Sequence, residues 1–168
     1  MQRRSLFKLG LASAAVLMVA GGTAALFQPG LDRGVLTPAG RGVFAAVGLA
    51  VLDKTLPVPG PQLDAAVAGL LSRIDVLISA LPPHAQNEVS QLLSLLASAP
   101  GRLAITGLTQ PWAQASMGDM QAALEGMRLS TLALRQQVYS ALHEITAGAY
   151  FSDPSTWSML GYPGPIKI

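Results

Sequence analysis

The 168-residue chain contains no cysteine and only two histidines. Without cysteine it forms no disulfide, no thiolate metal site, no iron–sulfur cluster and no covalent haem attachment. His84 and His143 are far apart and belong to no metal-binding motif. The serines lie in no nucleophile elbow, and the glycine-rich segments near the N-terminus follow no strand that would make them a dinucleotide site. The sequence therefore predicts no catalytic, cofactor-binding or metal-binding residue, and we expect that the chain is not an enzyme.

Charged residues are also scarce, at 12% of the chain against roughly a quarter in an average protein. Arg3, Arg4 and Lys8 account for three of the eleven basic residues, which leaves eight basic against nine acidic residues in the remainder. A nearly neutral domain of this kind offers no basic surface to nucleic acid. With few charges to cover a small domain, some apolar surface is expected to contact a partner or a membrane, unless Ala, Ser and Gln cover the domain instead.

The N-terminus resembles a twin-arginine export signal, carried by Arg3, Arg4, Phe7 and Lys8. An uncharged, mildly hydrophobic stretch follows from residue 9 to residue 27. Cleavage after Ala24 or Ala25 is one outcome. Retention as an anchor is the other, because about 20 apolar residues are needed to span a bilayer core. We therefore read residues 1–25 as a twin-arginine signal peptide or signal anchor, and expect a periplasmic protein that is free or tethered to the inner membrane.

Residues 26–35 are predicted to be a linker, and residues 36–150 a helical domain. Apolar residues recur at spacings of three and four, and no alternating strand pattern of any length is present. Thr37 and Pro38 mark one helix start, and Ser116 with Asp119 resembles a capping box at another. The fold is expected to be all-α, a small bundle of about four to five helices behind the N-terminal signal or anchor helix, with an irregular aromatic C-terminal tail.

The expected helix limits follow from the prolines and glycines between these apolar stripes. Residues 100–115 are expected to be irregular, with a short helix after Pro111 that carries Trp112. A bend or break is expected near residues 129–131. The predicted helices cover about 38–55, 62–80, 83–99 and 116–150.

Residues 151–168 form an aromatic tail rich in proline and glycine, which predicts a docking segment. The whole chain has nine Phe, Trp and Tyr residues, and aromatic side chains provide large contact area at low entropic cost. The alternative is a tail that folds back and closes its own bundle. The candidate partner-binding residues are Trp112, Tyr150, Phe151, Trp157, Tyr162, Pro163 and Gly164.

Short sequence elements resemble the family named for gluconate 2-dehydrogenase subunit 3. They are Leu36-Thr37-Pro38-Ala39 before a helix that ends at Leu56-Pro57, then Tyr150-Phe151-Ser152-Asp153-Pro154, and finally Leu160-Gly161-Tyr162-Pro163-Gly164. The resemblance implies a non-catalytic small subunit that is exported by the twin-arginine translocase together with a large FAD-dependent oxidoreductase of the glucose–methanol–choline type. The FAD would belong to that partner subunit, and a cytochrome c subunit would be a third component of some such complexes.

Two functional interpretations follow. In the first, the chain is an accessory subunit that carries a flavoprotein partner through export and stabilises it in the periplasm. In the second, it is a membrane-anchored periplasmic helical protein that binds a lipid or another apolar ligand between its helices. Co-purification with a flavoprotein would favour the first, and a stable monomer with extractable lipid the second.

Overall fold

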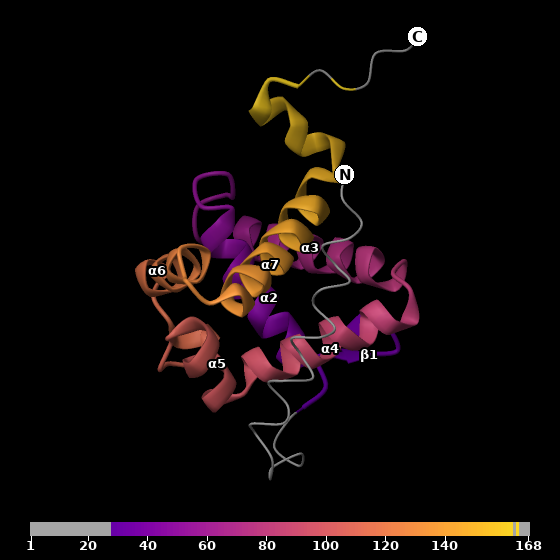
Figure 1. The fold of residues 1–168 in the computed structure, drawn as a ribbon. Coiled ribbons are helices and arrows are strands. Elements are labelled where there is room, and N and C mark those ends of the chain that lie inside the picture. Colours follow the sequence, from indigo (N-terminus) through magenta and orange to yellow (C-terminus); the bar gives the residue numbers. More distant parts are fainter. Residues whose placement is uncertain (1–27, 163, 165–168) are drawn as a thin grey trace.

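The computed structural model describes residues 28–162 and Gly164. The predicted signal residues Arg3, Arg4, Phe7 and Lys8, and the candidate Pro163, lie outside the described residues. The described chain is all-α, as predicted, with one minimal hairpin (Figure 1). Its elements, in chain order, are β1 (Leu31–Asp32), β2 (Val35–Leu36), α2 (Pro38–Val51), α3 (Pro61–Ser79), α4 (Pro83–Ala97), α5 (Ala99–Thr106), η3 (Trp112–Gln114), α6 (Met117–Arg128), α7 (Ala133–Phe151) and η4 (Pro154–Leu160).

Helix α2 forms the centre of the bundle and packs against α3, α4, α6 and α7. Phe44 and Val47 of α2 and Ile74 of α3 are completely buried, and Leu142 of α7 is nearly so. The apolar stripes predicted from the sequence supply this core. Burying such side chains is the main favourable contribution to folding.

Helix starts are set largely by proline and by side-chain caps. The Thr37 hydroxyl accepts a hydrogen bond from the Gly40 amide at 3.4 Å, and Pro38 opens α2. Pro61 and Pro83 open α3 and α4 in the same way, because proline has no amide hydrogen to leave unpaired in the first helical turn. Before α6, the predicted capping box of Ser116 and Asp119 is confirmed.

The prediction that residues 100–115 are largely irregular is wrong for their first part, where α5 forms. Ser98 caps this helix by accepting a hydrogen bond from the Gly101 amide at 3.2 Å. Pro100 lies in the first turn and therefore starts the helix instead of breaking it. The helix ends at Gly107, whose positive φ of 80° suits glycine. The short helix carrying Trp112 is present as η3.

The predicted bend or break near residues 129–131 is present as a complete break between α6 and α7. The Ser130 hydroxyl accepts a hydrogen bond from the Leu132 amide at 3.1 Å and so stabilises the turn. With α5 and this break, the described residues contain six α-helices, one more than the upper limit of the predicted four to five.

The described part of the predicted linker, residues 28–35, forms a hairpin together with Leu36. Leu31 pairs with Leu36 and Asp32 with Val35 across the antiparallel strands β1 and β2. Asp75 of α3 fixes the hairpin by accepting a hydrogen bond from the Leu36 amide at 2.8 Å. Within residues 28–162, no helix combines the length and the hydrophobicity that a membrane span requires.

Candidate partner-binding site

The C-terminal tail begins where α7 ends and is held to the bundle by polar contacts. Arg73 of α3 donates one hydrogen bond from Nε to the Ala149 carbonyl at 3.0 Å and another from its terminal nitrogen to Asp153 at 3.2 Å. The Thr156 hydroxyl donates to the carbonyls of Asp153 at 2.7 Å and Tyr150 at 3.3 Å. These bonds fix the direction in which η4 leaves α7.

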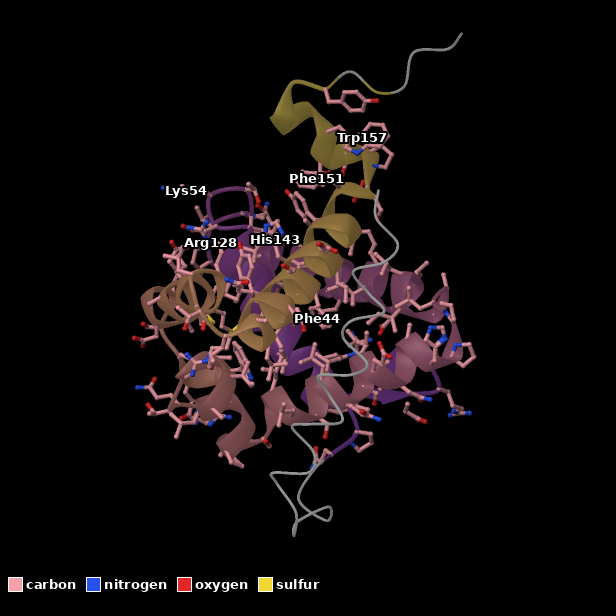
Figure 2. The ribbon with its side chains drawn as sticks, viewed as in Figure 1. Phe44, Lys54, Arg128, His143, Phe151 and Trp157 are labelled. Atoms are coloured by element: carbon pink, nitrogen blue, oxygen red, sulfur yellow. The ribbon has the colours of Figure 1, made fainter. Side chains whose placement is uncertain are left out.

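Beyond this anchor, η4 extends past the end of the bundle (Figure 1). Phe151 and Trp157 lie close together there (Figure 2), and the Trp157 indole donates a hydrogen bond to the Phe151 carbonyl at 2.8 Å. The chain then turns at Gly161, which has a φ of 67°. Because of this turn, the rings of Trp157 and Tyr162 are in contact, with centroids 5.5 Å apart.

Exposure separates the candidate residues into two groups. Tyr162 is 49% exposed, while Phe151, Trp157 and Gly164 are half-buried. These four residues therefore form a small aromatic surface, which we call the tail surface. A preformed surface of this kind suits protein recognition, because little side-chain entropy remains to be lost on binding.

Trp112 and Tyr150 belong instead to the core of the chain. Trp112 is 7% exposed and its indole donates to the Leu96 carbonyl at 2.8 Å. Tyr150 is 6% exposed and its hydroxyl donates to the Thr55 carbonyl at 3.2 Å. Both side chains are buried and form hydrogen bonds inside the bundle, so they do not belong to the tail surface.

Sequence reasoning missed the two residues that anchor the tail, Arg73 and Asp153. They are separated by 80 positions, so no local pattern connects them. Asp153 also accepts a hydrogen bond from the Ser155 amide at 2.9 Å. Hydrogen bonds from Ser155, with a smaller contribution from the Arg73 charge, lower the pKa of Asp153 below its ordinary value.

The two histidines, His84 of α4 and His143 of α7, are not part of the tail surface. His143 stacks on Tyr139, with ring centroids 5.6 Å apart, and both line a shallow pocket of about 260 Å³ with Glu125. Glu125 forms a 2.6 Å ion pair with Arg128 on the surface of α6. Among the described residues, no three His, Asp or Glu side chains come together as metal ligands.

Comparison of the chain with models of protein families, with curated proteins and with solved structures gave no match. The resemblance to the gluconate 2-dehydrogenase subunit 3 family is thus a prediction that depends on the short sequence elements quoted above.

Proposed function

We propose that this chain is a non-catalytic accessory subunit of a FAD-dependent oxidoreductase. In this proposal the chain binds the large flavoprotein subunit in the cytoplasm, directs it through twin-arginine export and stabilises it in the periplasm. The observation that carries the proposal is the twin-arginine pattern of Arg3 and Arg4 on a chain in which the sequence predicts no cofactor site of its own.

The twin-arginine route supports this proposal because it transports proteins that are already folded. A protein that contains FAD has to be assembled before it crosses the membrane by such a route. A chain with the signal and a partner with the cofactor would together satisfy that requirement. The sequence resemblance to a small-subunit family points to the same division of roles.

The tail surface supports the proposal because it offers a contact surface to a partner protein. Tyr162 exposes an aromatic ring at the end of the molecule, and Trp157 holds it in place through ring contact. The ion pair of Arg73 with Asp153 fixes the tail on α3. Aromatic side chains presented on a fixed backbone are frequent energetic centres of protein interfaces.

Co-production of the full chain with a large FAD-dependent oxidoreductase of the glucose–methanol–choline type from the same organism tests the proposal. Affinity purification through a tag on this chain should yield a complex of defined stoichiometry that contains FAD. A tagged variant carrying Tyr162→Ala provides the matched control and should retain less flavin. If the chain elutes as a monomer while the flavoprotein is fully active without it, the proposal is wrong.

A further inference from the structure

Arg102 of α5 is a buried cation that has no acidic partner among the described residues. The residue is only 5% exposed. Its terminal nitrogens make two long hydrogen bonds of 3.4 Å, to the carbonyls of Ala97 and Thr109. Its Nε is buried and has no hydrogen-bond partner among the described residues. A guanidinium has five N–H donors, so more than half of its capacity is unused.

The chain has no side-chain carboxylate available for Arg102. All nine Asp and Glu residues lie within residues 32–153, inside the described part. None of them has an oxygen within 4.0 Å of the Arg102 guanidinium. A buried positive charge that is not compensated is costly, and structures generally supply an anion or an acidic side chain at such a place.

Arg102 lines a pocket of about 450 Å³ between the ends of α2, α4 and α5. This volume lies within the range of roughly 300 to 1,000 Å³ for small-molecule sites. No Asp or Glu lines the pocket. Its apolar wall comes from Pro38, Ala39, Ala97 and Trp112.

Two helix N-termini add positive potential at the same place. Pro38 and Ala39 begin α2 and Ala99 begins α5, and all three line the pocket. Neither helix has an acidic residue in its first turn. The Thr37 and Ser98 hydroxyls cap one amide each, but no acidic side chain offsets the partial positive charge of either N-terminus, which therefore favours an anion.

We propose that this pocket binds a small organic carboxylate with a short apolar body. The planar guanidinium of Arg102 matches a carboxylate in shape and charge, and the proline, alanine and tryptophan wall suits a few methylene groups. The pocket lies beside α5, whereas η4 lies at the opposite end of the molecule (Figure 1). The inference therefore does not depend on the proposed function of the tail.

Hexanoate is a suitable probe, with hexanamide as the neutral molecule of nearly the same shape. The full chain carries two tryptophans, so a Trp157→Phe background leaves the fluorescence of Trp112 as the reporter. At constant ionic strength we expect a saturable change with hexanoate. Hexanamide should bind at least about tenfold more weakly, since it lacks the charge.

Two variants separate the pocket from the stability of the fold. Arg102→Met removes the charge and should weaken hexanoate binding at least about tenfold. Gly42→Leu retains Arg102 and adds a large side chain to the pocket lining, and the fold tolerates it because a Cβ at Gly42 meets no atom within 4 Å. It should weaken hexanoate binding while circular dichroism stays unchanged.

Arg135→Met is the matched control, because in the described part of the chain Arg135 also has a buried Nε without a hydrogen-bond partner but does not line this pocket. It should bind hexanoate as the parent does. The inference is overturned if hexanoate gives no saturable change, if hexanamide binds equally well, or if the folded Gly42→Leu variant binds hexanoate with parental affinity.

Discussion

Arg73 and Asp153 form a 3.2 Å ion pair that joins the middle of α3 to a position two residues beyond the end of α7. The same arginine donates a hydrogen bond to the Ala149 carbonyl near the end of α7. Through these two contacts one side chain of α3 holds both the last turn of α7 and the residue that precedes η4. The orientation of the tail surface is therefore a property of the bundle and not of the tail alone.

Replacing Arg73 with methionine should release the tail while the core remains folded. The lost hydrogen bond to Ala149 is worth about 1 kcal/mol of unfolding free energy, and the partly exposed ion pair adds little. Urea unfolding followed by circular dichroism measures this loss, and limited proteolysis reports the freedom of η4. Arg128→Met, which removes an exposed pair on α6, should leave both measurements unchanged. Equal protease resistance in the Arg73 variant would contradict the anchoring role.

Acid should release the tail through Asp153. Hydrogen bonds from Ser155, and to a lesser degree the charge of Arg73, lower the pKa of this carboxyl in the folded protein. The stabilising contribution is therefore complete above the unfolded pKa of about 3.9 and is lost as the pH falls through the lower folded value.

Trp157 fluorescence, in a Trp112→Phe background, should show a transition below about pH 4. Asp153→Asn should abolish that transition, because the amide does not titrate. A transition that persists in the Asp153→Asn variant would assign the acid sensitivity to another group.

Two glycines in helices should respond to alanine in opposite directions. A Cβ at Gly101 would lie 2.2 Å from the Leu95 carbonyl oxygen, so Gly101→Ala forces α4 and α5 apart. We expect a loss of about 2 kcal/mol in unfolding free energy. Gly126 of α6 has open space around it, and Gly126→Ala should gain about 0.5 to 1 kcal/mol from the higher helix propensity of alanine. Thermal unfolding of both variants, compared with the parent, shows whether each substitution raises or lowers the stability.

The sequence was sufficient to predict the helices whose apolar residues recur regularly. The stripe that includes Leu70, Ile74 and Ile78 predicts α3 almost to the residue, because that face must be buried. It was not sufficient for α5. There Pro100 and Gly101 resemble helix breakers, and the Ser98 cap together with the place of Pro100 in the first turn makes them compatible with a helix.

The candidate site was predictable in composition but not in geometry. The concentration of aromatic residues near the C-terminus identified the tail. Which of them face outward depends on tertiary partners. The Leu96 carbonyl accepts a hydrogen bond from the Trp112 indole, and the Thr55 carbonyl accepts one from the Tyr150 hydroxyl. Such contacts over 16 and 95 positions have no signature in the local sequence.

Tyr162→Ala should weaken binding of the proposed flavoprotein partner without changing the fold. Tyr162 is 49% exposed, so removal of its ring costs little stability. A central aromatic side chain of an interface typically contributes roughly tenfold or more in affinity. Calorimetric titration of the partner measures the change. Leu132→Ala, which removes a side chain 59% exposed on a different part of the surface, is the control and should bind normally. Parental affinity in the Tyr162 variant would remove the tail surface from the interface.

The most direct test of the accessory-subunit account is the location of the flavoprotein when the signal of this chain is inactivated. With Arg3→Lys and Arg4→Lys together, the account predicts that the FAD-containing partner disappears from the periplasm and accumulates in the cytoplasm, as measured by its activity and its flavin in each fraction. Full export of the partner with the doubly substituted chain would contradict the account.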